Sequence, residues 1–144
     1  MTLTAAIALG RLTAAPGVGR WIGRAAAATD LSPRRSWMSS VVSLSDEDAV
    51  TKFRKIHPKS ILYFTATWCP PCKAIGPVYE NMSIDHPNIA FGKVDVDNNQ
   101  EAAAEFKVSS VPTFVTFDGE EAVEKFLGAD RDKLTRHVLE LEGR

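Results

Sequence analysis

A continuous apolar run at residues 61–64 leads within a few positions to a pair of cysteines, Cys69 and Cys72. A strand that is apolar at consecutive positions is typical of burial on both faces, because an exposed face would alternate with polar residues. Such a strand needs other elements to cover both sides of its sheet. We therefore expect the cysteines to lie where a buried strand meets the start of a helix.

Caps, turn residues and apolar periodicity divide the rest of the domain into further elements. Residues 45–48 (Ser-Asp-Glu-Asp) are typical of a helix N-cap, and Pro58 ends that helix near residue 56. Pro77 is expected to kink the helix after the cysteines. The expected elements are a helix ending at 56, strands at 61–64 and 89–96, helices at 69–83 and 98–106, a hairpin at 113–127 and a helix at 130–141. This order predicts an α/β fold with a central mixed β-sheet flanked by helices on both faces.

Residues 1–40 differ in composition from the rest of the chain. They are rich in Ala, Arg, Gly and Ser, with five arginines and a single acid, Asp30. Such a leader is typical of a mitochondrial or plastid transit peptide, and a disordered tail is the alternative. We expect a transit peptide at residues 1–40 and a folded domain at 41–144. The mitochondrial matrix is the expected location because Arg is more prominent than Ser, with the plastid as the alternative.

The charge of the predicted domain disfavours nucleic-acid binding. The formal charge of the chain is −1 and residues 1–40 carry +4, so residues 41–144 carry −5. The domain therefore has no excess positive charge to attract phosphate backbones. No apolar stretch approaches the roughly 20 residues that a membrane-spanning helix needs. We expect no nucleic-acid partner, no membrane insertion and a monomer.

The two cysteines are the only ones in the chain, and three positions separate them, so they cannot join distant segments. They would supply only half of a zinc site, and His57, His86 and His137 lack the spacing to complete it. A structural bridge or a coincidence stays possible for this spacing. The position before a helix favours redox chemistry, because a helix N-terminus stabilises a thiolate. Cys69 is expected to be exposed and reactive, and Cys72, one turn inside the helix, to be more buried.

Four separated segments resemble the thioredoxin family, and the resemblance extends over about residues 41–141. They are residues 68–73 (WCPPCK), Pro77, residues 111–113 (VPT) and residues 127–129 (LGA). With its leader, the chain is most similar to the o-type mitochondrial thioredoxins of plants. The resemblance implies a thioredoxin fold and a redox-active disulfide between Cys69 and Cys72. It also implies reduction of protein disulfides by reversible dithiol/disulfide exchange.

The same resemblance implies partners and supporting residues. The partners are disulfide-containing target proteins and an NADPH-dependent thioredoxin reductase, and no bound cofactor or metal is expected. The peptide bond before Pro112 is expected to be cis. The residues implied to line the target groove are Trp68, Pro70, Val111, Pro112, Gly128 and Ala129.

Two positions depart from the family pattern. Pro70 stands where glycine is usual, which removes one N–H from the helix start. Tyr63 stands where many thioredoxins carry a buried aspartate that helps to deprotonate the second cysteine, and a tyrosine with a pKa near 10 is a poor base. Lys93 matches the lysine that pairs with that aspartate. Asp95, two residues further along the same strand, is expected to face the same side and to take over the proton transfer, with water as the alternative.

Other functions remain open for a pair of this kind. An oxidase or isomerase would use the same cysteines at a different reduction potential. A binding module would use the groove without turnover, and a dimer would hold an iron–sulfur cluster through Cys69 thiolates. A reductase of protein disulfides is the function that we expect.

Overall fold

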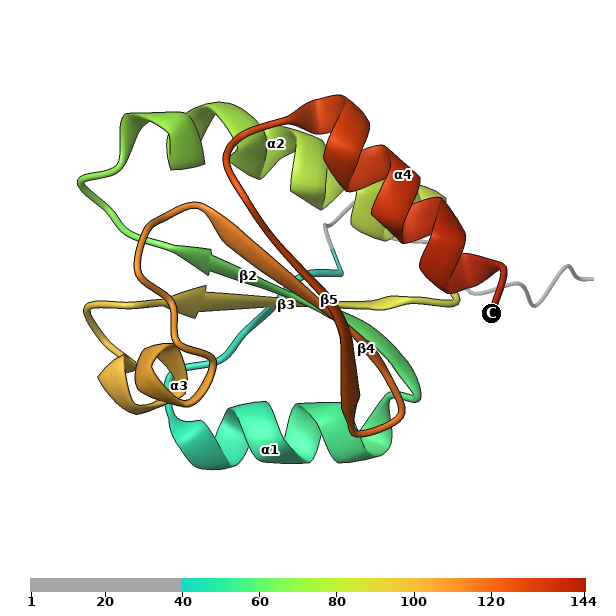
Figure 1. The fold of residues 1–144 in the computed structure, drawn as a ribbon, viewed down its shortest axis with the longest axis horizontal. Helices are drawn as coiled ribbons and strands as arrows, with labels where there is room; N and C mark the ends of the chain where they lie inside the picture. The colour runs from blue at the N-terminus through green and yellow to red at the C-terminus, as the bar shows by residue number, and fades with distance from the viewer. Residues whose placement is uncertain (1–39) are drawn as a thin grey trace, which may run out of the picture. The chain divides into compact units, whose positions relative to one another are not determined.

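The computed structural model describes residues 40–144, which form a five-stranded sheet with helices on both faces (Figure 1). The elements are β1 (Val42–Ser43), α1 (Glu47–Ile56), β2 (Lys59–Thr65), α2 (Pro70–Asp85), β3 (Ala90–Asp95), α3 (Gln100–Glu105), β4 (Thr113–Asp118), β5 (Glu121–Leu127) and α4 (Arg131–Glu142). Each predicted helix and strand occurs, with ends that differ by a few residues. The predicted leader lies outside the described residues except for Ser40, so it stays a prediction.

The strands are arranged in the order β1-β3-β2-β4-β5, with β2 at the centre. β2 pairs in parallel with β3, where Tyr63 lies opposite Lys93, and antiparallel with β4, where Tyr63 lies opposite Phe114. In Figure 1, α2 and α4 cover one face of the sheet and α1 and α3 cover the other. The predicted mixed sheet flanked by helices on both faces is therefore confirmed.

The core consists of two apolar clusters, one on each face of the sheet. Side chains alternate along β2, since successive residues of a strand point to opposite faces. Ile61 and Tyr63 belong to the cluster that packs against α2 and α4, whereas Leu62 and Phe64 belong to the cluster that packs against α1. The apolar run at residues 61–64 is thus buried on both faces, as predicted.

Each of the four helices in the described part of the chain begins at a side chain that accepts a hydrogen bond from its first turn. The capping residues are Asp46 for α1, Cys69 for α2, Asn99 for α3 and Asp130 for α4. The predicted start of the first helix agrees with the Asp46 cap, and α3 begins later than predicted because Asn99 caps it. None of the helices described for residues 40–144 is long and apolar enough to cross a membrane.

Ser40 is bound to α2, although the sequence analysis placed the start of the domain at residue 41. The N–H of Ser40 donates to the hydroxyl of Ser83 over 3.1 Å, and the hydroxyl of Ser40 donates to the carbonyl oxygen of Ser83 over 3.1 Å. These two bonds hold the segment before β1 against the helix that carries the cysteines.

Candidate active site

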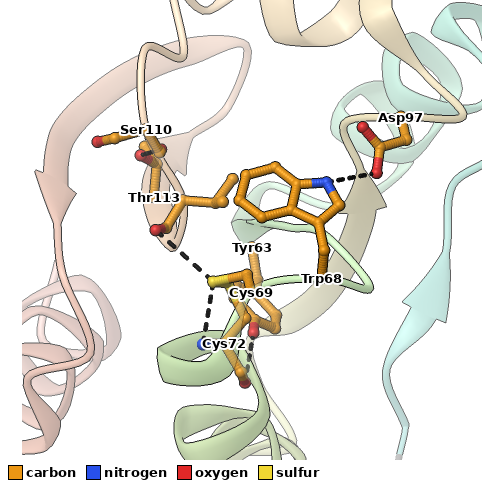
Figure 2. The surroundings of a disulfide bond; sticks show 8 residues. Tyr63, Trp68, Cys69, Cys72, Asp97, Ser110 and Thr113 are labelled. Atoms are coloured by element: carbon orange, nitrogen blue, oxygen red, sulfur yellow. Dashed lines mark hydrogen bonds between the residues drawn. A yellow bond between two sulfur atoms is a disulfide. The ribbon is translucent and has the colours of Figure 1, made fainter.

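The two cysteines lie at the junction of β2 and α2 and form a disulfide (Figure 2). Cys69 is the N-cap of α2, with an extended backbone at φ −91° and ψ 107°. The N–H of Cys72 lies 3.2 Å from the Sγ of Cys69. After reduction, this N–H and the positive end of the helix dipole both favour a negative charge on that sulfur. The strand-to-helix junction therefore prepares Cys69 for ionisation.

The two prolines between the cysteines occupy the first two positions of α2. Proline is well accommodated there, because its fixed φ suits a helix and its missing N–H would lack a helical partner anyway. The hydrogen bond to the Cys69 sulfur comes from the third position, Cys72, and not from residue 70. The departure at Pro70 therefore leaves this donor to the thiolate in place.

The predicted difference in exposure between the two cysteines is wrong for the disulfide form. Cys69 and Cys72 are each 2% exposed, and both belong to the cluster on the α2 face of the sheet. The prediction considered the helix alone, whereas the carbonyl oxygen of Val111, in the loop before β4, lies 3.7 Å from the Cys69 sulfur. The cysteines differ in their contacts instead, since Cys69 caps the helix and meets this loop.

Two loops meet beside the disulfide through residues that the sequence placed in the target groove. The peptide bond between Val111 and Pro112 is cis. The carbonyl oxygen of Pro112 accepts the N–H of Gly128 over 2.9 Å, which joins the loop before β4 to the loop after β5. Gly128 has φ +95°, a backbone conformation that residues other than glycine rarely adopt. In the loop before β4, the hydroxyl of Thr113 donates to the carbonyl oxygen of Ser110 over 2.6 Å.

Trp68 directly precedes Cys69, and Figure 2 shows its indole ring reaching toward Asp97. Its side chain is 65% exposed, and its indole N–H donates to a carboxylate oxygen of Asp97 over 2.9 Å. Asp97 was not predicted to have a role, and its position just after β3 is a signal that could have indicated one. Pro70 and Ala129 are also exposed. Contact of these groove residues with a target stays a prediction.

Tyr63 is held by its hydroxyl group and cannot replace the missing aspartate as a base. The hydroxyl donates to the carbonyl oxygen of Cys72 over 2.8 Å, and the ring stacks on Phe114. Burial raises the pKa of the Tyr63 phenol above its ordinary value, against a lowering contribution from Thr65. The phenol therefore keeps its proton at neutral pH, and Tyr63 positions the backbone of Cys72 instead.

A cavity of about 540 Å³ brings the remaining predicted supporting residues together with Cys72. Tyr63, Lys93 and Asp95 line it, which agrees with the expectation that Asp95 faces the same side as Lys93. The carboxylate of Asp95 also accepts the N–H of Asp97 over 3.0 Å. Glu80 of α2 lines this cavity too, and the sequence analysis missed it.

Comparisons with known proteins agree with this geometry. The family model "Thioredoxin" matches residues 40–140 of the chain. The chain is 40% identical over 102 residues to a TPR repeat-containing thioredoxin of Arabidopsis thaliana, a match that covers 70% of this chain and 27% of that protein. It is 47% identical over 78 residues to an H-type thioredoxin of Picea mariana, covering 54% of this chain and 62% of that protein. The chain thus spans less than two thirds of the length of these relatives.

Solved structures resemble the chain over nearly their whole length. Oxidised mitochondrial thioredoxin 3 of Saccharomyces cerevisiae has a TM-score of 0.68 and 30% identity, with 73% of this chain and 99% of that chain covered. The thioredoxin of Malassezia sympodialis has a TM-score of 0.68 and 34% identity, with 72% of this chain and 92% of that chain covered.

Proposed function

This chain belongs to the thioredoxin family, and we propose that it is a thiol–disulfide oxidoreductase that reduces disulfides in target proteins. One observation carries the proposal: Cys69 caps α2, with the N–H of Cys72 3.2 Å from its sulfur, and forms a disulfide with Cys72. The pair can therefore alternate between a disulfide and a dithiol that contains a stabilised thiolate.

The reaction proceeds in two exchange steps. The thiolate of Cys69 attacks one sulfur of a target disulfide, so that a mixed disulfide forms and the other target sulfur leaves as a thiolate. Cys72 then loses its proton and attacks the Cys69 sulfur, which releases the second target sulfur and restores the disulfide. The backbone at Val111, next to the Cys69 sulfur, is available to pair with an extended target segment.

Each cycle leaves the chain oxidised, and we propose an NADPH-dependent thioredoxin reductase as the electron donor. The first test combines the purified chain with NADPH, thioredoxin reductase and insulin, and follows NADPH consumption at 340 nm. We expect turnover with the natural chain and only the background rate with Cys69→Ser, because that variant lacks the attacking sulfur. Turnover by Cys69→Ser equal to that of the natural chain would refute the proposal.

The reduction potential separates a reductase from an oxidase or an isomerase. Thioredoxin has a potential of about −270 mV, whereas protein disulfide isomerase lies at about −180 mV and the oxidase DsbA at about −120 mV. We expect a value close to that of thioredoxin. Equilibration with glutathione or dithiothreitol buffers, read by the change in tryptophan fluorescence of the chain, measures the potential. A potential above about −200 mV would favour the two rivals.

We propose further that the chain is an o-type mitochondrial thioredoxin with a removable leader and that it works as a monomer in the matrix. The arginine-rich composition of residues 1–40 supports the leader and the mitochondrial location. The named plant relatives above are an H-type and a TPR-containing thioredoxin, so the subgroup rests on the leader and on the cysteine segment.

The leader is expected to be dispensable for folding and sufficient for targeting. A chain that begins at Ser36 keeps Ser40 and its bonds to Ser83, so its free energy of unfolding in urea should match that of the full chain. Residues 1–40 fused to a fluorescent protein should accumulate in mitochondria of plant cells. Accumulation in plastids or the cytosol would contradict the location, and loss of cooperative unfolding in the shortened chain would show that the leader belongs to the domain.

A further inference from the structure

The cavity beside Cys72 is separate from the predicted target groove. Its walls include Cys72 but neither Cys69 nor any of the six groove residues. During the second exchange step the target is bonded to Cys69 and occupies the groove. Within the part of the chain that the structure describes, the cavity reaches Cys72 without passing the groove, so it offers the proton of Cys72 a route that a bound target leaves open.

One face of α2 leads through this cavity from Cys72 to a carboxylate. Residues 72, 76 and 80 are spaced four apart, so they lie on one face of the helix, and all three line the cavity. The residue between the two ends is Gly76, and a Cβ atom added there would meet nothing within 4 Å. The helix face between Cys72 and Glu80 therefore has room for water.

Of the two carboxylates that line the cavity, Glu80 has fewer hydrogen bonds within the described residues. Asp95 accepts the backbone N–H of Asp97, and this bond offsets part of its charge. The main-chain carbonyl of Glu80 accepts the hydroxyl of Ser83, but within residues 40–144 its carboxylate has no hydrogen bond or ion pair. Burial is the main cause of the raised pKa of Tyr63, and the negative charge of Glu80 raises that pKa further. The Tyr63 hydroxyl lies 2.8 Å from the Cys72 carbonyl oxygen.

We propose that Glu80 accepts, through water in this cavity, the proton that Cys72 loses when it resolves the mixed disulfide. The inference rests on the proposed function. The S–S bond between Cys69 and the target breaks as the Cys69–Cys72 bond forms, the target sulfur leaves with the electron pair, and the proton passes from Cys72 to Glu80 and on to solvent. Four further titratable side chains line the same cavity: Tyr63 from β2, Lys73 from α2, and Lys93 and Asp95 from β3.

The test separates the two exchange steps by stopped flow. Reduced chain reacts with 5,5′-dithiobis(2-nitrobenzoate), whose yellow thiolate is released once when Cys69 is labelled and again when Cys72 displaces the label. The first phase depends on reagent concentration, whereas the second is intramolecular. Both phases are recorded from pH 6 to pH 9 for the natural chain, Glu80→Gln, Asp95→Asn and a charge-matched control, Glu121→Gln, which lies on β5 outside the cavity.

Loss of a proton acceptor should slow only the second phase. We expect Glu80→Gln to slow it by about tenfold or more near pH 6.5, and the loss to shrink toward pH 9, where hydroxide deprotonates the thiol. The first phase and the Glu121→Gln control should stay within about twofold of the natural chain. Equal second-phase rates for Glu80→Gln and the natural chain at every pH, or a larger loss in Asp95→Asn than in Glu80→Gln, would overturn the assignment. A natural chain that lacks a second phase would instead refute the proposed function.

Discussion

The Cys72→Ser variant is expected to accumulate target proteins as stable mixed disulfides. Cys69 keeps its place at the N-cap of α2, where the N–H of residue 72 lies 3.2 Å from its sulfur and survives the substitution. The first exchange step therefore still proceeds. The second step is lost because serine offers no thiolate to displace the target, so each attack ends in a covalent complex.

The matched variant is Cys69→Ser, which retains one thiol at the other position. Cys72 is as buried as Cys69 but lies inside the helix and does not cap it, so its thiol lacks the stabilisation that Cys69 receives. Each variant is immobilised, exposed to a mitochondrial extract and washed, and bound proteins are eluted with dithiothreitol and counted on a gel. We expect many bands from Cys72→Ser and almost none from Cys69→Ser. Equal capture by the two variants would show that the attacking and resolving roles are assigned wrongly.

The architecture was predictable because its strongest signals are local. The apolar run at residues 61–64 required a sheet covered on both faces, and β2 is the central strand with one cluster on each side. Prolines and acids set the ends of α1, since Asp46 caps the helix and Pro58 follows it. Such features depend on a few neighbouring residues, so the sequence carries them directly.

The surroundings of the disulfide were less predictable because they depend on loops that come together only in the fold. The Cys69 sulfur meets the carbonyl oxygen of Val111, which is 42 positions away in the chain. The bond from Trp68 to Asp97 likewise joins the loop before α2 to the end of β3. Nothing in the local pattern of either residue indicates its partner.

Glu80 shows a signal that was present in the sequence but was not used. Asp95 was predicted to replace the usual aspartate because it lies on the strand that carries Lys93. The spacing of eight residues from Cys72 to Glu80 would have indicated a shared helix face. Whether that face borders a cavity depends on Gly76 and on the distance between α2 and the sheet, which only the fold determines.

A second large effect is expected at Gly92, which is buried in β3 beneath α1. A Cβ atom added there would lie 2.8 Å from Leu62, 2.9 Å from Leu44 and 3.1 Å from Phe53, closer than side-chain carbons normally approach. All three neighbours are at most 5% exposed, so none can rotate into solvent to make room. Gly92→Val adds two further methyl groups and should lower the free energy of unfolding by about 3 kcal/mol.

For a domain of this size, such a loss lowers the melting temperature by about 10–20 °C. Urea unfolding measures the loss as a shift of the midpoint at constant slope. Gly143→Ala is the control: it too replaces a glycine, but its Cβ would meet only two carbonyl oxygens, at 3.5 and 3.8 Å, which is ordinary contact, so its effect should stay within about 0.5 kcal/mol. A midpoint for Gly92→Val equal to that of Gly143→Ala would mean that Leu44 and Leu62 repack around the new side chain, and that β3 is not held at this distance by close packing.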